Sequence, residues 1–408
     1  MNQAILEMKI NRSEQSRIVT VATVFFIAFL IIVIRRWFQF KHPAVWSEDG
    51  KYVVPGLLTM GWKYIFYPIN GYLIVPSKIC SWLSLKISFV HYDVVSTILA
   101  CLMQAACVTV IACAPSLLTA QYALAAAVVL VPIYPEVFGL PLYVFWWTTL
   151  LLFPALFWRG NNPIKQMTLS LIGGCSSPVV VALSPAFIFC AIRRKEKGII
   201  LSAIIVCMSA FVQLYFIFHQ PPSDDMHNKI TFNNLMKIIN IFFGLYAFFL
   251  HGKYITLLGF ILLLIIFYGC FLVRNREYYF LLLFCLFSMI ALSIARAPIY
   301  IIHPVFCAPR YFFFPYVILS WILIYLVMQG KSMALPAGLM IILALAGLPH
   351  RFIRHQQSVT AWPTQVHQCL SQDMTDFQLQ IDDTPDTAWT KQYTRKMCLD
   401  GIHQEILK

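Results

Sequence analysis

The sequence predicts an all-α protein that crosses a membrane many times. Of its 408 residues, 60% are hydrophobic and only 12% are charged, whereas soluble globular chains carry about 45–50% apolar and about 25% charged residues. The mean hydropathy is +0.74, and long apolar runs are separated by short polar turns. Because a spanning helix needs about 20 apolar residues, we expect about eleven such helices in a membrane domain over 1–348, followed by a polar tail over 349–408.

The first apolar run covers residues 18–34 and is followed by Arg35, Arg36 and Trp37. It is longer than the apolar part of a signal peptide and lacks a small-residue cleavage site, so we expect a retained membrane helix. The first loop, over residues 35–90, is expected to carry short helices that lie on the membrane surface. Further spans are expected near 93–112, 119–133, 145–158, 199–219, 255–273, 278–295, 312–329 and 333–348, with an interfacial or re-entrant helix near 241–250.

Residues 166–192 are too long for one span and too short for two. Gly173-Gly174 and Ser176-Ser177-Pro178 interrupt the run, and Pro185 is expected to kink the second half. This pattern predicts two short helices that meet near the outer face. Broken helices occur at membrane depth only where protein or a water-filled cavity covers the freed backbone groups, so we expect a cavity there.

Most cations lie in short turns, which indicates how the chain is oriented. Short loops rich in Lys and Arg stay on the cytoplasmic side, so these turns and the N-terminus are expected inside, and the first loop and the tail outside. The net charge of +13 then reflects membrane orientation rather than nucleic-acid binding. The four basic turns contain Arg193 to Lys197, Arg159 with Lys165, Arg274 with Arg276, and Lys331.

The twelve cysteines divide into two groups. Most lie inside apolar runs, where a free thiol behaves as a small hydrophobic group. Cys369 and Cys398 stand apart in the polar tail, where an oxidising outer compartment would allow a disulfide between them. Two free thiols would equally account for the sequence. No cysteine pair has zinc-ligand spacing.

The few acids outside the tail are candidates for chemistry. Glu48 and Asp49 follow the first apolar run, and Glu136 lies at the mouth of a later one. With Arg296 and Arg310, they would share one membrane face. This set suits transfer from a lipid-linked phosphate to a hydroxyl, because a guanidinium binds phosphate oxygens and a carboxylate accepts the hydroxyl proton.

Each of these residues also has a structural interpretation. Glu48 or Asp49 could cap the short helix expected near Tyr52. Arg310 could be an interfacial anchor whose side chain reaches the lipid headgroups. Tyr311 is typical of an aromatic belt at the membrane interface, and His303 is typical of a loop histidine.

The sequence also argues against several classes of protein. It has no phosphate-binding loop and no Gly-x-Gly-x-x-Gly turn. His350 and His355 are not spaced as metal ligands on one helix face. Charged residues inside the apolar runs are scarce, which argues against a proton-coupled pump or an ion channel.

The chain resembles the multispanning glycosyltransferases of the GT-C fold, most closely the O-antigen glucosyltransferases that convert serotype in enteric bacteria and their phages. The likeness covers most of the chain as an ordering of short motifs. These motifs are Trp46-Ser47-Glu48-Asp49-Gly50, Gly71-Tyr72-Leu73, Ser176-Ser177-Pro178 with Pro185, Pro309-Arg310-Tyr311, and the polar tail.

The resemblance implies an inverting enzyme of the bacterial inner membrane whose active site faces the periplasm. Its donor would be a sugar, expected to be glucose, on undecaprenyl phosphate, and its acceptor would be lipid-linked O-antigen. A donor-synthesising transferase and a flippase would be its working partners. Some branches of the fold bind a divalent metal, but no decisive ligand set is present in this sequence, and no other cofactor is expected.

The resemblance and the chemistry together give a set of expected site residues. The expected catalytic acids are Asp49 or Glu48, with Glu136. The donor phosphate would contact Arg310, Tyr311 and Arg296, and the sugars would contact Trp46, Tyr52, Tyr72 and His303.

Two other classes of protein stay open. One is an O-antigen polymerase or ligase, which would rely on Arg and His in late outer loops. The other is a lipid-linked glycan transporter without chemistry.

Overall fold

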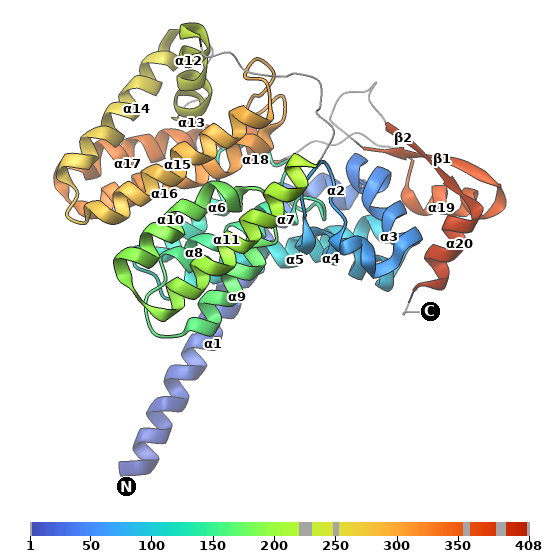
Figure 1. Cartoon of the computed structure of the whole chain (residues 1–408), viewed down its shortest axis with the longest axis horizontal. Coiled ribbons are helices and arrows are strands. Elements are labelled where there is room, and N and C mark those ends of the chain that lie inside the picture. Colours follow the sequence, from blue (N-terminus) through green and yellow to red (C-terminus); the bar gives the residue numbers. More distant parts are fainter. Residues whose placement is uncertain (1, 220–230, 248–252, 354–359, 381–388, 406–408) are drawn as a thin grey trace.

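The computed structural model describes residues 2–219, 231–247, 253–353, 360–380 and 389–405 (Figure 1). This part of the chain is mostly helical, and six of its helices are long and apolar enough to cross a membrane. Those features are as expected for a polytopic membrane protein. The six candidate spans are Gln15–Arg35, Tyr92–Cys113, Lys197–Phe218, Tyr254–Leu272, Arg276–Arg296 and Pro309–Gln329.

Short helices alternate with these long ones. The first half of the chain contains α1 (Asn2–Arg35), α2 (Trp37–Lys41), the π-helical turn η1 (Asp49–Val53), α3 (Val54–Met60), the 3₁₀ turn η2 (Gly61–Phe66), α4 (Val75–Ile87), α5 (Tyr92–Cys113), α6 (Gln121–Val129), α7 (Val144–Thr149), α8 (Leu152–Leu156), α9 (Pro163–Gly174) and α10 (Val179–Arg194). The second half of the membrane part contains α11 (Lys197–Phe218), α12 (Phe232–Ile239), η3 (Asn240–Gly244), α13 (Leu245–Ala247), α14 (Lys253–Leu272), α15 (Arg276–Arg296), η4 (Pro309–Phe312), α16 (Phe313–Gln329), α17 (Lys331–Ala346) and α18 (Pro349–Phe352).

Two predicted spans are shorter than expected. Where the sequence suggested spans near 119–133 and 145–158, the chain forms only α6 and the pair α7 and α8. Proline explains part of the difference, because the residue before a proline is disfavoured in a helix and proline itself lacks an N–H group. Pro132, Pro135 and Pro141 keep the segment between α6 and α7 out of regular helix.

This irregular segment, residues 130–143, is nevertheless buried, so its backbone groups need partners. The guanidinium of Arg35 donates hydrogen bonds to the carbonyl oxygens of Val129, Val131 and Ile133 at 2.8, 3.1 and 2.6 Å. Arg351 donates to the Pro132 carbonyl at 2.7 Å. Two arginines at helix ends therefore satisfy a non-helical segment in the middle of the protein.

The expected break within residues 166–192 is present, between α9 and α10. The Ser176 hydroxyl donates to Thr148 Oγ1 at 2.8 Å, and the Ser177 and Thr149 hydroxyls lie 2.9 Å apart. These bonds fix the break against α7. Pro185 lies inside α10 without ending it.

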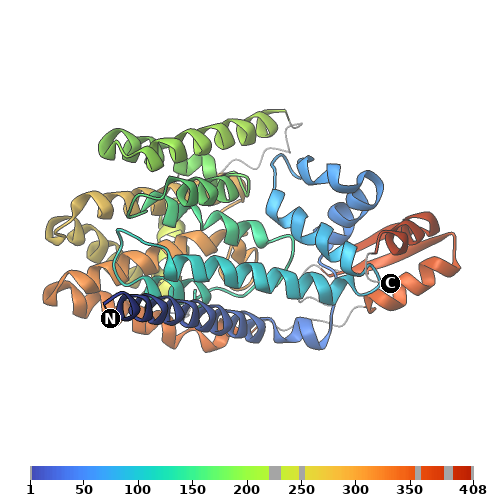
Figure 2. The same ribbon diagram turned by 90° about the horizontal axis from the view of Figure 1, so that it is seen from below.

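Different segments of the chain lie at the two ends of the helical bundle (Figure 2). Residues 37–90 and the C-terminal tail lie at the end away from the N-terminus. The basic turns meet at the other end, which we call the basic end. There, Arg194 donates to the carbonyls of Leu156 and Trp158, and Arg193 lies 3.7 Å from the Glu277 carboxylate.

The tail is a small unit of two helices and a two-stranded sheet, and the described residues as a whole are mostly helical, as expected for an all-α protein. Cys369 and Cys398 form a disulfide between its two helices. Trp362 is buried against Phe377 and Tyr393 in its core. Its elements are α19 (Trp362–Ser371), β1 (Met374–Leu379), β2 (Trp389–Thr394), which pairs antiparallel with β1, and α20 (Arg395–His403).

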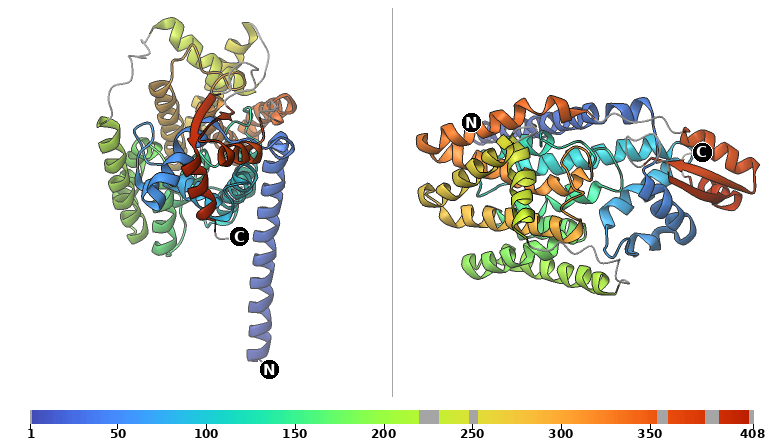
Figure 3. Two further views of the ribbon diagram at one scale, coloured as in Figure 1. Left: turned by 90° about the vertical axis from the view of Figure 1, so that its right-hand side faces the viewer. Right: turned by 90° about the horizontal axis from the view of Figure 1, so that it is seen from above.

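The tail packs on the first loop (Figure 3). Gln380 forms a backbone bridge with the segment around Trp46: it accepts from Ser47 N at 2.6 Å and donates to Val45 O at 3.0 Å. The Leu379 side chain fills the space beside Gly50, where a Cβ would lie 2.2 Å from it. The tail therefore fixes the conformation of residues 45–50.

Candidate functional site

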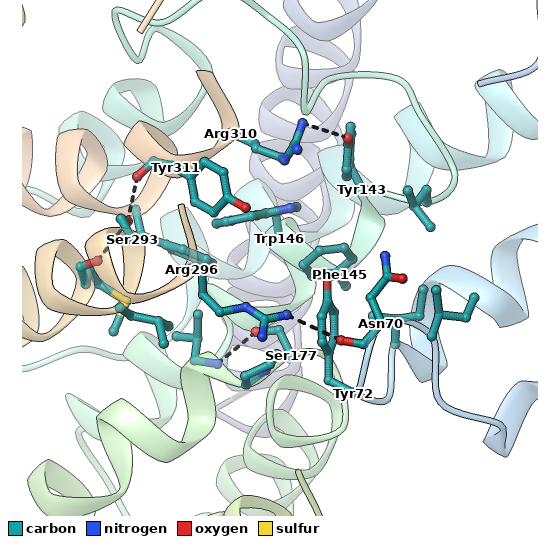
Figure 4. Close-up of a pocket in the computed structure, with 18 of the residues that line it drawn as sticks. Asn70, Tyr72, Tyr143, Phe145, Trp146, Ser177, Ser293, Arg296, Arg310 and Tyr311 are labelled. Carbon is teal, nitrogen blue, oxygen red and sulfur yellow. Dashed lines mark hydrogen bonds between the residues drawn. The ribbon is translucent and has the colours of Figure 1, made fainter. Parts of the chain in front are cut away.

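A polar cavity of about 560 Å³ lies where the first loop meets the broken helices (Figure 4). We call it the polar cavity. Segments from seven parts of the chain line it, including the break between α9 and α10 that the sequence placed beside a cavity. Its lining residues are Glu48, Ile69, Asn70, Tyr72, Ile74, Leu142, Tyr143, Phe145, Trp146, Ser177, Pro178, Val179, Ile217, Met289, Leu292, Ser293, Arg296, Arg310, Tyr311 and Phe314.

A buried ion pair forms one side of the polar cavity. The Glu136 side chain is 2% exposed and pairs with the Arg310 guanidinium. Its second oxygen, Oε2, accepts from the Arg310 backbone N–H at 3.0 Å. The Tyr143 hydroxyl donates to Glu136 Oε1 at 3.2 Å. Glu136 therefore orients Arg310 and Tyr143, and it does not itself line the cavity.

Glu48 is the carboxylate that reaches the polar cavity. Its Oε2 accepts from the Trp46 indole N–H at 3.3 Å and lies 3.4 Å from the Tyr143 hydroxyl. Tyr143 has one proton for two carboxylates, Glu48 and Glu136, so it can donate to only one of them at a time. The result is a continuous hydrogen-bonded row from Trp46 to Arg310.

Asp49 lies behind Glu48 and is fully buried. Its Oδ2 accepts from the Leu142 backbone N–H at 3.3 Å, whereas Oδ1 has no partner among the described residues. Burial raises the pKa of Asp49 well above its ordinary value, and the nearby charge of Glu48 adds to the increase. The Asp49 carboxyl group does not line the polar cavity, and its expected role as a catalytic acid stays a prediction.

Arg296 supplies a second cation on the opposite wall. It donates to the Asn70 carbonyl at 3.4 Å and lies 5.2 Å from the centre of the Tyr72 ring. No carboxylate in the described part of the chain pairs with it. Burial raises the pKa of Tyr72 to about 12, so this phenol is a proton donor at neutral pH.

Aromatic side chains form the floor of the polar cavity. Phe145 packs between Tyr72 and Trp146, with ring centres 6.1 and 5.3 Å away, and Trp146 packs on Phe314 at 5.0 Å. The Trp146 indole nitrogen is buried and has no acceptor among the described residues. Flat aromatic faces of this kind are suited to packing against a sugar ring.

The remaining wall is apolar. Ile217, Met289 and Leu292 line it, from the ends of α11 and α15. Both helices are candidate membrane spans. The polar cavity therefore joins charged and aromatic groups to a surface that suits a lipid chain.

Three expected sugar contacts lie elsewhere. Trp46 is 3% exposed and holds Glu48 rather than lining the cavity. Tyr52 is exposed, and Lys51 lies over its ring at 5.4 Å. His303 stacks on Phe306, and its Nδ1 accepts from the backbone N–H groups of Val305 and Phe306, so it organises its own loop.

Several lining residues were not expected from the sequence, notably Tyr143, Trp146 and Asn70. Trp146 falls at the start of the span expected near 145–158, and Tyr143 lies just before it, so neither was expected to line a cavity. Asn70 has a left-handed backbone with φ of 48°, and the asparagine-glycine pair with Gly71 was the available signal of a turn. Tyr311, by contrast, lines the polar cavity as expected.

Within the described ranges, no three His, Cys, Asp or Glu side chains lie close enough together to hold a metal ion. Comparison with known proteins adds no family assignment: no protein-family model, curated protein or solved structure matches the chain. Function must therefore be inferred from the residues of the site.

Proposed function

We propose that this chain is an inverting glycosyltransferase of the bacterial inner membrane. It would move a sugar, expected to be glucose, from undecaprenyl phosphate to O-antigen at the periplasmic face. The observation that carries the proposal is the lining of the polar cavity. There, a carboxylate, two arginines, an aromatic floor and an apolar wall meet in one space.

The two arginines would divide the work of binding the donor phosphate. Arg296 has no carboxylate partner in the described structure, so its charge is free for an anion. Arg310 is already paired with Glu136, which fixes its guanidinium and lowers the net charge that it offers. The lipid chain would leave the cavity along Ile217, Met289 and Leu292, between α11 and α15.

Glu48 would act as the general base. The acceptor hydroxyl gives its proton to Glu48 while its oxygen forms a bond to the anomeric carbon. The bond from that carbon to the phosphate oxygen breaks, and its electron pair leaves with the polyprenyl phosphate. Arg296 and Arg310 stabilise the charge that develops on the phosphate. One displacement of this kind inverts the anomeric centre.

The orientation follows from the charge distribution. The basic end would face the cytoplasm, and the end with the first loop and the tail would face the periplasm. In this arrangement the shorter helices complete a GT-C-like membrane domain of about eleven membrane segments. The tail disulfide fits an oxidising compartment.

The deciding experiment compares Glu48→Gln with the wild-type protein in cells. Mass analysis of O-antigen should show one additional hexose per repeat with the wild type. Glu48→Gln should reduce transfer at least about 100-fold, since removing a general base costs 10²–10⁴-fold. Glu277→Gln, a carboxylate at the basic end, is the matched control and should keep activity.

Three outcomes would overturn parts of the proposal. Full modification by Glu48→Gln at normal protein level would remove Glu48 as the base. No mass difference between cells with and without the protein would instead favour a lipid-linked glycan transporter. A change in O-antigen chain length, without added hexose, would favour a polymerase or ligase.

A further inference from the structure

A second cavity, of about 440 Å³, lies at the basic end. We call it the basic-end cavity. It is formed by the middle of α1, the C-terminal end of α5 and the start of α9, and it shares no lining residue with the polar cavity. Its walls are mostly apolar and include Val21, Val110 and Leu169.

Two cations line the basic-end cavity. Arg17 comes from α1 and Lys165 from α9, and both side chains are exposed. No carboxylate among the described side chains pairs with either of them. Lys165 lies in the first turn of α9, where the helix dipole adds to the attraction for an anion. The cavity therefore combines an apolar wall with two exposed cations.

A buried hydrogen-bond donor is a second indication of a ligand, independent of these charges. Trp158 also lines the cavity and is 3% exposed, and its indole N–H has no acceptor in the described structure. An indole can only donate, so it needs an oxygen or another acceptor. A buried donor without one loses the bond that water gives it in the unfolded chain.

We propose that the basic-end cavity binds one anionic phospholipid. Its phosphate oxygens would accept from Trp158 and lie between Arg17 and Lys165, and its acyl chain would cover Val21, Val110 and Leu169. Basic pockets between membrane helices are suited to such headgroups. A soluble phosphate would leave the apolar walls uncovered, which favours the lipid. This site is separate from the proposed glycosyl transfer and does not depend on it.

Native mass spectrometry of the full chain in detergent would test the site. The protein is titrated with phosphatidylglycerol, and separately with phosphatidylcholine of the same acyl chains and with inorganic phosphate. The wild type should bind one phosphatidylglycerol in preference to the other two. Loss of each cation should weaken binding about fivefold, so Arg17→Gln with Lys165→Gln should weaken it about 25-fold. Trp158→Phe keeps an aromatic ring and should also weaken binding.

Lys197→Gln is the matched control, since Lys197 is an exposed cation of the same end that does not line the cavity. It should bind phosphatidylglycerol as the wild type does. Equal binding of both lipids, or unchanged affinity in the double variant and in Trp158→Phe, would overturn the proposal. Preference for inorganic phosphate would identify a soluble anion as the ligand instead. The mass spectrum reports these outcomes even if every variant keeps full transferase activity.

Discussion

The polar cavity and the basic end carry charge in different ways. Beside the polar cavity, Glu136 is 2% exposed and pairs with an arginine whose side chain is 29% exposed. At the basic end, the Arg193 side chain is 70% exposed, and its partner Glu277 lies at the longer distance of 3.7 Å. One pair is part of the interior, and the other is largely solvated.

This difference separates charges that position other groups from charges that orient the chain. A buried charge needs a partner, and removing that partner leaves an uncompensated charge in a poor solvent. An exposed pair is worth little, because water and salt screen it. Substitutions near the polar cavity should therefore change stability and activity, whereas those at exposed basic-end positions should change neither much.

Removal of the tail disulfide should have the largest effect on stability. The variant Cys369→Ala with Cys398→Ala loses a cross-link over a sequence separation of 29 residues, worth about 3–4 kcal/mol by the chain-entropy relation. Urea unfolding of the full chain, with limited proteolysis to follow the tail, measures the loss. Transfer should also fall, because the tail fixes residues 45–50 beside Glu48.

Cys207→Ala is the control, since it removes a free thiol from α11. It should leave both unfolding and transfer close to those of the wild type. A disulfide-free protein with normal transfer would show that Glu48 keeps its position without a firmly docked tail.

Substitution of Glu136 should have the second-largest effect on stability. Glu136→Gln leaves the Arg310 guanidinium without its anionic partner, and we expect a loss of about 3 kcal/mol, at the low end for a buried pair because Arg310 keeps some exposure. Tyr143 would then donate to Glu48 alone. Urea unfolding and the O-antigen assay on the same preparation separate the two effects. If Glu136→Gln unfolds as the wild type does, the Glu136–Arg310 pair positions side chains without stabilising the protein.

Two of the predicted residues around the polar cavity lie where apolar runs begin or end. Arg296 ends the candidate span Arg276–Arg296, and Arg310 lies at the start of Pro309–Gln329. Boundaries of membrane helices are visible in composition, and side chains at boundaries on one face can meet. Their convergence on one cavity is therefore consistent with the pattern of the sequence.

The composition of the sequence does not show which of Glu48 and Asp49 faces the polar cavity. Neighbouring residues on a helical turn point in directions about 100° apart, so only one of them can face a given cavity. The orientation of the turn depends on contacts with Gln380 and Leu379, which lie far later in the chain. Tyr143 was missed because it lies just before the span expected near 145–158, in a segment whose burial the sequence does not reveal.

A smaller effect is expected for Asp49→Asn. The folded state holds a proton on Asp49 at pH values where the unfolded chain, with a pKa near its ordinary value of about 3.9, has lost it. The free energy of unfolding of the wild type therefore falls as pH rises above that ordinary value, until the raised pKa of the folded state is passed. The substituted amide does not titrate, so this part of the slope should disappear in the variant.

Urea unfolding from pH 4 to pH 8 measures the two slopes, with Asp373→Asn, an exposed acid, as the control. At pH values below the raised pKa of the folded state, Asp49→Asn should change stability by less than about 1 kcal/mol, because the amide resembles the protonated carboxyl group. It should also keep most transfer activity, unlike Glu48→Gln. Loss of transfer at normal protein level would return Asp49 to the chemistry.

The smallest effect should come from Arg193→Gln. Its partner Glu277 is itself 30% exposed, and pairs of this kind contribute between about 0 and 1 kcal/mol, so we expect a change within about 0.5 kcal/mol. Added salt should remove even that, since screening weakens exposed pairs first. The same salt should leave the cost of Glu136→Gln almost unchanged. If Arg193→Gln and Glu136→Gln instead destabilise the protein equally, burial does not distinguish the two ends, and the positioning role given to Glu136 loses its physical basis.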